Sequence, residues 1–458
     1  MSLAPPDLGV GIGWRPELAT DLLRAPRVVD FVEVVAETCF AQAAARREAR
    51  ALAEIWPVVP HGVKLSLGSA EGIDLDKARR LGGLARELRA PAISEHVALT
   101  RAGGREIGHL TPLPFTRDAI SVLARNVAAA RHVLPDVPFL LENVAWTFRW
   151  PEDAIPEADF YAEVVKATGC DLLLDVANLF ANARNSGVDP AVALQGYPLD
   201  RVAMVHVAGG ELDDGFYLDT HAHPVPDAVF GLLGALVERA GALPVVLERD
   251  SRFPVFPEVR EEIGRIRSVC AARPAALRAR STAPRAPSPA GSPAAARRHE
   301  LAGRQALLAA WLTTEAFSPH EAPGFDVAAL RRTRSVLQHK RVDDALPLLP
   351  RTVAQGEAAR CAAFAALEGA PRPAHGAGVA DALRIAEAAF QDPQLAAAAG
   401  RDLLELRSRF VARGCEGARP RRGPFLGREA LPGGRSVWAM KGFGPEAAVR
   451  LFEFGGER

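Results

Sequence analysis

The sequence predicts an α/β protein in which a (β/α)8 barrel, or TIM barrel, is followed by a smaller and mainly helical domain. Between Val10 and about Asp250, short apolar runs alternate with longer amphipathic runs, a pattern typical of strands joined by helices. Eight such units in about 250 residues match the usual size of this barrel. From Glu300 onward, apolar residues recur at helical spacing alone, which indicates a second domain of a different class.

Eight apolar runs form the expected barrel strands, and most flank a helix-like segment such as Leu75–Arg89, Thr116–His132 or Phe160–Thr168. Strands that alternate with helices imply parallel pairing through right-handed crossovers. An open doubly wound sheet is the alternative, but it usually carries a glycine-rich phosphate loop after its first strand, and GVGIGW does not supply one. The strands are expected at Val10–Trp14, Phe31–Val35, Val58–His61, Ala92–Val97, Phe139–Val144, Leu172–Ala177, Val202–Val207 and Pro244–Arg249.

The composition changes after the barrel segment. Residues 269–298 are rich in Ala, Pro, Arg and Ser and have no apolar periodicity, so we expect a linker that is extended where its prolines cluster. The barrel domain is therefore expected at 1–268 and the mainly helical domain at 299–458. Near the C-terminal end, the short runs SVWAM and AAVRLFEF are candidate strands.

Overall composition excludes several classes of protein. The formal net charge is +0, so no global field favours nucleic acid or a membrane surface. No apolar run approaches the ~18 residues that a membrane span needs, and the start, MSLAPPDLGVGIG, lacks the features of a signal peptide. The five cysteines contain no CxxC pair, which argues against a disulfide framework and a thiolate zinc site. We expect a cytoplasmic protein with neither nucleic acid nor membrane as a partner.

Polar side chains follow the apolar residues at the ends of six expected strands. Because the carboxyl ends of all barrel strands face one mouth, these side chains should converge there although they are far apart in sequence. The loop after the seventh strand adds three further candidates. The strand-end residues are His61, Glu95, His96, Glu142, Asn143, Asp175, Asn178, His206, Glu248 and Asp250, and the loop residues are Asp219, His221 and His223.

Taken singly, these residues have ordinary structural explanations. Glu142 or Asp175 could cap the following helix, and a lone His96 is more often a hydrogen-bonded core residue. Together, that many carboxylates and imidazoles in one mouth would cost several kcal/mol per uncompensated charge unless cations were present. Nitrogen and oxygen ligands without thiolate suit iron, manganese or zinc. Their number exceeds the need of one metal, so we expect two or more ions, bridged by a carboxylate such as Glu142 or Glu248.

Nine segments, in order, resemble motifs of the multinuclear non-haem iron-dependent oxidases, a family that includes the oxidase of methanobactin biosynthesis. The resemblance covers about residues 8–265. It implies a TIM barrel that holds two or three iron ions, uses dioxygen as co-substrate and modifies cysteine residues of ribosomally made precursor peptides. The segments are GIGWRPEL, FVEVVAE, HGVKLSLGS, SEHVA, LLENV, LLLDVANL, VHVAGG, DTHAHPVPD and LERD.

The resemblance also implies roles for individual residues. Asp175 would be either a ligand or a partner of the ligands, His223 is the alternate for His221, and Asp250 would act as a base on the substrate. The segment ETCF departs from the family pattern, so Glu37 is left out of the expected site. The implied iron ligands are His61, His96, Glu142, Asn178, His206, Asp219, His221 and Glu248.

Members of this family commonly act with a separate partner protein that recruits the peptide. Here GFD at 324–326 and the stretch LQHKRVDDALPLLP resemble a small helical domain found beside such oxidases. The resemblance therefore implies a recruitment domain that is fused to the barrel. An unrelated helical appendage, for instance one for dimerisation, is the alternative.

Two rival functions remain open at this point. A zinc or manganese phosphodiesterase or sugar isomerase could use the same barrel and the same ligand types. It would need basic groups to hold phosphate at the mouth, where only Arg249 and Lys64 are candidates. A non-enzymatic metal-storage or peptide-binding module is the other rival, but it would not need an unligated base such as Asp250.

Overall fold

The computed structural model describes residues 7–271, 295–313, 324–372, 376–412 and 417–455, and these residues form two compact units. Unit 1 contains Met1–Thr100 and Leu110–Ala302, and unit 2 contains Arg101–His109 and Gly303–Arg458. Most of the predicted linker at 269–298 lies outside the described residues. Its described ends are helical, because α10 (Phe256–Ala271) and α11 (Ala295–Thr313) reach into it.

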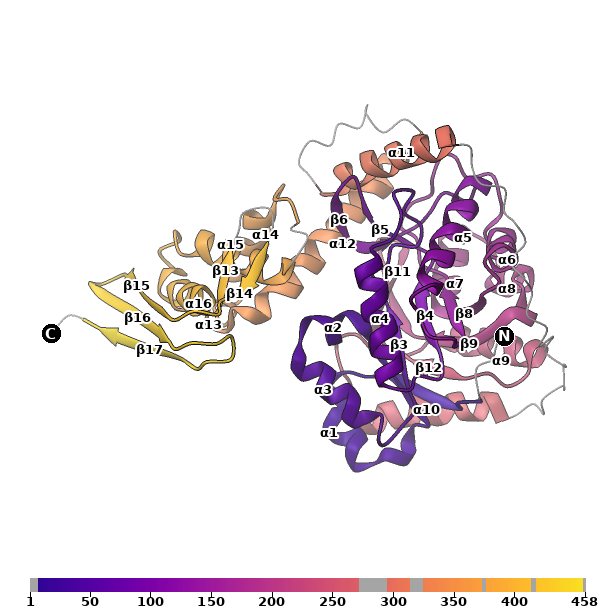
Figure 1. Cartoon of the computed structure of the whole chain (residues 1–458), viewed down its shortest axis with the longest axis horizontal. Coiled ribbons are helices and arrows are strands. Elements are labelled where there is room, and N and C mark those ends of the chain that lie inside the picture. The colour runs from indigo at the N-terminus through magenta and orange to yellow at the C-terminus, as the bar shows by residue number, and fades with distance from the viewer. Residues whose placement is uncertain (1–6, 272–294, 314–323, 373–375, 413–416, 456–458) are drawn as a thin grey trace. The chain divides into compact units, whose positions relative to one another are not determined.

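Unit 1 is a closed barrel of parallel strands in the order β1-β12-β9-β8-β7-β4-β3-β2 (Figure 1). Each of the eight predicted strands overlaps one of these, so the predicted TIM barrel is confirmed. The barrel strands are β1 (Val10–Gly13), β2 (Phe31–Val35), β3 (Val58–Gly62), β4 (Ile93–His96), β7 (Phe139–Glu142), β8 (Asp171–Asp175), β9 (Val202–Val207) and β12 (Val245–Leu247).

Amphipathic helices surround the barrel and bury their apolar faces against it (Figure 1). Side-chain caps fix several of their starts: Asp74 accepts from two amides of the first turn of α4, and Thr116 accepts from Ala119 N in α5. The helices are α1 (Pro16–Arg24), α2 (Ala36–Ala41), α3 (Ala43–Leu52), α4 (Leu75–Glu87), α5 (Arg117–Arg131), α6 (Glu157–Thr168), α7 (Val176–Asn185), α8 (Pro190–Gly196), α9 (Asp227–Ala240) and α10.

The barrel interior contains an apolar layer directly beneath a polar layer. Because side chains alternate between the two faces of a strand, the residue two positions further along points into the barrel again. Seven strands follow this rule: seven of the nine residues of a buried apolar cluster are each followed, two positions later, by a polar residue. The apolar residues are Phe31, Val59, Ala92, Leu140, Leu173, Met204 and Val246. Their polar successors are Glu33, His61, Ser94, Glu142, Asp175, His206 and Glu248.

Two antiparallel hairpins interrupt the alternation of strands and helices. The first, β5 (Leu99–Ala102) with β6 (Arg105–Thr111), follows β4, but its residues 101–109 belong by their packing to unit 2. The second, β10 (Gly209–Asp213) with β11 (Phe216–His223), follows β9. The sequence predicted a short acidic loop where this second hairpin lies. In the structure Asp219 and His221 are instead part of the strand β11.

Unit 2 is mainly helical, as predicted, and its described residues also form small sheets (Figure 1). Apolar residues of α12, α14, α15 and α16 form its largest core cluster, and a sheet of β15, β16 and β17 packs on α16 through Leu404, Val437 and Ala439. Both candidate strands near the C-terminal end belong to this sheet. The elements are α11, α12 (Val327–Ala345), α13 (Pro350–Val353), α14 (Glu357–Leu367), α15 (Ala377–Ala389), α16 (Ala396–Arg409), β13 (Phe410–Ala412), β14 (Ala418–Pro420), β15 (Phe425–Leu431), β16 (Arg435–Lys441) and β17 (Val449–Phe454).

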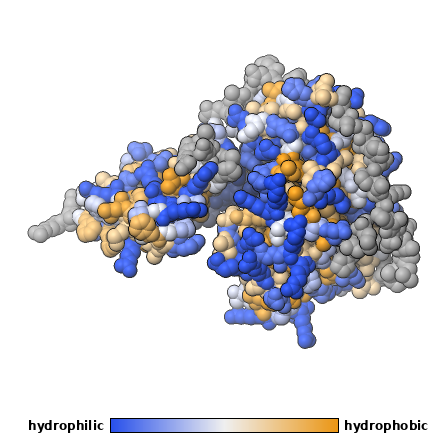
Figure 2. All heavy atoms as spheres, viewed as in Figure 1, coloured by the Kyte–Doolittle hydropathy of each residue, from blue (hydrophilic) through white to orange (hydrophobic). Residues whose placement is uncertain are grey.

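Hydrophilic and hydrophobic residues are mixed on the face drawn in Figure 2. Among the helices of the described residues, none is both long and apolar enough to cross a bilayer.

Candidate metal centre

Glu142, at the end of β7, lies at the centre of the polar layer and is fully buried. Its Oε2 is 3.5 Å from His61 Nε2 and 3.3 Å from His96 Nε2, and its Oε1 is 3.3 Å from His206 Nδ1. The three imidazoles come from β3, β4 and β9, so the barrel closure is what brings them to one carboxylate. Such a group, with one ring nitrogen of each histidine turned to the same point, has the geometry of a metal site.

The other ring nitrogen of each histidine has a fixed partner. His61 Nδ1 lies 2.8 Å from Ser94 Oγ, and His96 Nδ1 lies 3.2 Å from the carbonyl oxygen of Gly62. His206 Nε2 lies 3.1 Å from Glu33 Oε1. Metal-bound histidines almost always use their second nitrogen in this way, which fixes the tautomer and the ring orientation.

Among the described residues, two groups of side chains could hold a metal ion, and they share Glu142. The first contains His61, His96 and Glu142; the second contains Glu142, Asp175, His206 and Glu248. Within each group, the candidate ligand atoms lie within 4.8 Å of one another. Glu248 Oε2 is 3.2 Å from His206 Nδ1 and also 3.2 Å from His221 Nδ1, so it connects the second group to β11.

The two carboxylate oxygens of Asp175 have different surroundings. Its Oδ1 accepts from the amides of Ala177 and Asn178 and so caps α7, which is the ordinary explanation that the sequence left open. Its Oδ2 is buried, makes no hydrogen bond and lies 3.8 Å from His221 Nε2. The cap therefore accounts for only one of its two oxygens.

At the mouth of the barrel, β11 and the segment after β12 bring further polar residues together. His221 Nε2 is 2.8 Å from Asp219 Oδ2, and His221 Nδ1 is 3.5 Å from Asp250 Oδ2. Asp250, whose side chain is 46% exposed, also pairs with Arg15 from the segment after β1. His221 has a φ of 49°, a left-handed conformation that a side chain of this size rarely adopts and that is frequent at functional sites.

The pKa values of the residues in this cluster depend on burial and on the charges of their neighbours, and some are raised while others are lowered. Burial alone would raise the pKa of Glu142, but the charges of His96, His206 and His61 lower it to about 2. Burial opposes protonation of His96, yet Glu142 and Glu95 raise its pKa to about 9. For Asp175, burial and then the charge of Asp219 raise the pKa well above its usual value. Without other cations, the carboxylates thus depend on protonated imidazoles for charge balance.

The donor set fits divalent metal ions. Buried polar groups in proteins are normally hydrogen-bonded, but six buried atoms of this cluster meet no partner in hydrogen-bonding geometry. Each of them carries a lone pair that a cation can accept, and none belongs to a thiol. Nitrogen and oxygen donors of this kind suit iron, manganese or zinc. The six atoms are Glu142 Oε2, Asp175 Oδ2, Asn178 Oδ1, His206 Nδ1, Asp219 Oδ1 and His221 Nε2.

Sequence reasoning missed Glu33. This residue is 3% exposed and lies on β2 between apolar neighbours. It contacts His206 directly, and its Oε2 is 4.0 Å from His61 Nδ1. A lone carboxylate inside a buried strand was the signal, because a buried charge needs a partner.

Three other polar residues lie outside the two ligand groups. His223, the alternate for His221, instead pairs with Glu211 Oε2 at 2.9 Å. Glu37 accepts from the amide of Val63, and burial followed by the charge of Glu95 raises its pKa to about 7. Arg249, a candidate phosphate ligand in the rival reading, is buried and donates to Glu262 Oε2 at 2.7 Å.

A family model matches residues 9–271, more than half of the chain, and its description is RiPP precursor modification enzyme MbnB/TglH/ChrH. The chain belongs to this family. RiPP denotes a ribosomally synthesised and post-translationally modified peptide, so membership implies an enzyme whose substrate is a precursor peptide. The matched segment ends with α10 and contains every residue of the two ligand groups.

Individual relatives agree with this assignment. A UPF0276 protein of Caulobacter vibrioides is 39% identical over 266 residues, which are 57% of this chain and 94% of the relative. A UPF0276 protein of Streptomyces avermitilis is 45% identical over 267 residues, or 57% of this chain. The match spans 54% of the Streptomyces relative, about half of its length.

Several solved structures resemble the barrel at low sequence identity. Endonuclease IV from Thermus thermophilus is 18% identical, with a TM-score of 0.37 over 57% of this chain and 97% of that one. A xylose isomerase domain protein from Planctomyces limnophilus is 15% identical, with a TM-score of 0.41 over 58% of this chain and 100% of that one.

Proposed function

We propose that the chain is a multinuclear non-haem iron enzyme that uses dioxygen to modify cysteine residues of a RiPP precursor peptide. The observation that carries the proposal is the position of Glu142. One buried carboxylate is shared by two ligand groups and faced by three imidazoles whose other nitrogens are already held. A carboxylate in this position can bridge two metal ions.

The second ligand group and its neighbours extend the proposed centre. Asn178, Asp219 and His221 each carry a buried atom that could bind a metal ion and has no hydrogen-bond partner. Asp175 Oδ2 faces His221, and Glu248 contacts both His206 and His221. This supports a third set of ligands beside the first two, and hence two or three ions.

Iron is favoured over zinc and manganese by the resemblance to the multinuclear iron oxidases, and all three fit the donors. When bound, iron would supply the oxidising chemistry with dioxygen and would bind the substrate thiolate, since metal binding favours the deprotonated sulfur. The protein's part is to hold the ions in place. Ser94, the Gly62 carbonyl and Glu33 do this by fixing the histidine rings.

Asp250 is placed to take a proton from the peptide. It stands at the mouth, partly exposed, beside His221 and Arg15. Burial raises its pKa, but the hydrogen bond to His221 and the charges of His221 and Arg15 lower it to about 2, so its carboxylate is ionised, as a proton acceptor must be. Arg15 positions this carboxylate.

Unit 2 is proposed to recruit the precursor peptide. The support is its sequence resemblance to the helical partner domains of such oxidases, with the fusion replacing a separate protein. Tethering would raise the effective concentration of peptide at the barrel, to about the millimolar range for short flexible linkers.

The proposed function is tested with anaerobically purified full chain, iron and a cysteine-containing precursor peptide. Oxygen uptake should depend on iron and on the peptide. Replacing the peptide's cysteine by serine should abolish both oxygen uptake and the mass change of the peptide. Full activity with a single zinc ion would contradict the proposal.

A further inference from the structure

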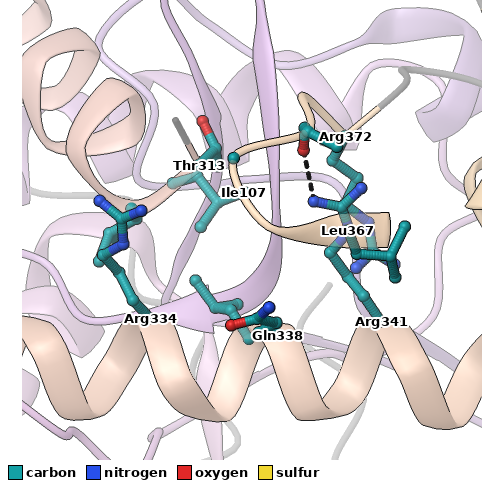
Figure 3. A pocket seen from close by; sticks show the side chains of 11 residues that line it. Ile107, Thr313, Arg334, Gln338, Arg341, Leu367 and Arg372 are labelled. Atoms are coloured by element: carbon teal, nitrogen blue, oxygen red, sulfur yellow. Dashed lines mark hydrogen bonds between the residues drawn. The ribbon is translucent and has the colours of Figure 1, made fainter. Parts of the chain in front are cut away.

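Unit 2 contains a pocket of its own, between α12, β6 and the segment after α14 (Figure 3). Its cavity volume is about 50 Å³, or about 450 Å³ when the open solvent at its mouth is counted. Arg334, Gln338 and Arg341 line it from one face of α12, because positions i, i+4 and i+7 of a helix lie in a row. Arg372 and Ile107, both labelled in Figure 3, also line the pocket.

The lining is cationic. Three arginines line the pocket, and its described lining residues include no carboxylate. Arg341 is already balanced: its Nε and Nη2 donate to the two oxygens of the buried Asp381 at 2.9 and 2.7 Å, and its Nη1 donates to the carbonyl oxygen of Ala370. Arg334 Nη1 donates to a neutral acceptor, the carbonyl oxygen of Trp311.

Arg372 is a mostly buried cation whose hydrogen-bonding capacity is only partly used. Its side chain is only 8% exposed, and its one ion pair among the described residues is a 3.3 Å contact from Nη2 to Asp344 Oδ2. Its Nη1 is buried and makes no hydrogen bond. An unsatisfied donor on a buried cation is costly, which indicates that a further acceptor belongs beside it.

The hairpin of β5 and β6 holds this guanidinium in place. Gly108 has a φ of +85°, and a Cβ at this position would lie 2.7 Å from the Cζ, Nε and Nη1 atoms of Arg372. Only glycine therefore permits this close approach. The close backbone of Gly108 limits the positions that this guanidinium can take, and a guanidinium presents its N–H donors in a fixed fork that matches planar acceptors.

We propose that this pocket binds an oxyanion, with Arg372 as its principal contact. Guanidinium groups match carboxylate and phosphate oxygens, and the charge-assisted hydrogen bonds they form are stronger than neutral ones. The source we infer is an acidic side chain of the precursor peptide, an inference that rests on the proposed function of unit 2. A free oxyanion such as phosphate shares the same chemistry.

The test uses the full chain and a fluorescent hexaglutamate peptide, with hexaglutamine as the neutral counterpart, and measures binding by anisotropy. Arg372→Met should weaken hexaglutamate binding about tenfold or more, because a hydrogen bond to a charged group is lost. Arg360→Met is the matched control. Arg360 also pairs with an aspartate of α12, Asp343, but does not line the pocket, and this variant should bind like the wild type.

A second variant keeps all three arginines. Gln338→Glu places a carboxylate in the pocket, where it should compete with hexaglutamate and abolish its binding. Circular dichroism checks that both variants fold. If Arg372→Met and Gln338→Glu both bind hexaglutamate as tightly as Arg360→Met, the pocket is not an oxyanion site.

Inorganic phosphate separates the two sources. Phosphate should bind much more weakly than hexaglutamate and displace it only at high concentration; equal affinity for phosphate would overturn the assignment to the peptide. None of these measurements requires turnover. An Arg372-dependent affinity in a protein that never modifies a peptide would therefore reject the proposed function and leave the oxyanion site standing.

Discussion

Glu142 faces three imidazoles from three strands, so its removal should affect the whole metal centre. We expect Glu142→Ala to lose most of its bound iron, because both ligand groups share this carboxylate. Elemental analysis of anaerobically prepared protein measures the loss. Glu157→Gln is the control, since Glu157 is a partly buried carboxylate of the same barrel that hydrogen-bonds to Asn182 and Tyr197 outside the ligand groups. Equal iron in the two variants would remove Glu142 from the centre.

Glu33 acts through His206, and its effect should be smaller. Glu33→Gln keeps an acceptor near His206 Nε2 but removes the negative charge that makes the imidazole a better ligand. Metal affinity should fall about 10–100-fold, the usual effect of changing such a partner. A chelator titration that follows iron release measures the change. An unchanged chelator midpoint would show that Glu33 does not support the ligand.

Asp250 should matter for turnover and not for metal content. Asp250→Asn removes the proposed base while keeping the size of the side chain, and we expect turnover to fall about 10²–10⁴-fold. Iron per chain should stay at the wild-type value, because Asp250 is outside both ligand groups. Loss of iron together with activity would instead make Asp250 a ligand.

Most of these residues could be found in the sequence because each ends an apolar strand. Glu33 was missed because it lies in the middle of its strand, with Val34 and Val35 after it. The alternation rule would have found it: Phe31 and Glu33 are two positions apart, as are Val59 and His61. Which ring nitrogen faces Glu142 depends on Ser94 and on the Gly62 carbonyl, and no sequence pattern gives that orientation.

At the scale of helices and strands, a buried ion pair between Arg341 and Asp381 joins α12 to α15 in unit 2. Asp381→Asn leaves the guanidinium of Arg341 buried without its countercharge, and we expect a loss of about 3–5 kcal/mol in local stability. Asp343 also lies on α12, and Asp343→Asn breaks its exposed ion pair with Arg360 of α14. This change should cost about 0–1 kcal/mol. Hydrogen exchange of the α12 and α15 peptides compares the two variants. Similar protection in both would mean that the buried pair contributes little.

The barrel strands were predictable because each contains a run of buried apolar residues, as strands of parallel sheets usually do. The two hairpins were missed because polar residues interrupt the apolar residues of their strands. Their turns did carry a signal: Gly103 and Gly104, and likewise Asp214 and Gly215, have positive φ, as two-residue hairpin turns require. That residues 101–109 pack with unit 2 follows from contacts distant in sequence, which local patterns do not encode.

At the scale of the whole molecule, the barrel is proposed to hold the metal centre and unit 2 to recruit the peptide. Expressing the barrel segment and unit 2 as separate fragments tests these two roles. Residues 1–271 alone should keep the iron centre, because all the ligand residues lie in this segment. They should lose affinity for the precursor peptide, and a fragment from residue 295 onward should restore turnover partly at high concentration. The hairpin residue Ile107, buried in the full chain, should exchange its amide faster in the isolated segment. If residues 1–271 process the peptide as fast as the full chain, unit 2 does not recruit it.

The most direct test of the central claim is mass spectrometry of the precursor peptide after reaction with iron-loaded full chain and dioxygen. We predict a mass change confined to the fragment that contains the cysteine. The change should be absent when that cysteine is serine and when the enzyme carries Glu142→Ala. An unaltered cysteine after incubation with full chain that holds its iron and has access to dioxygen would contradict the account.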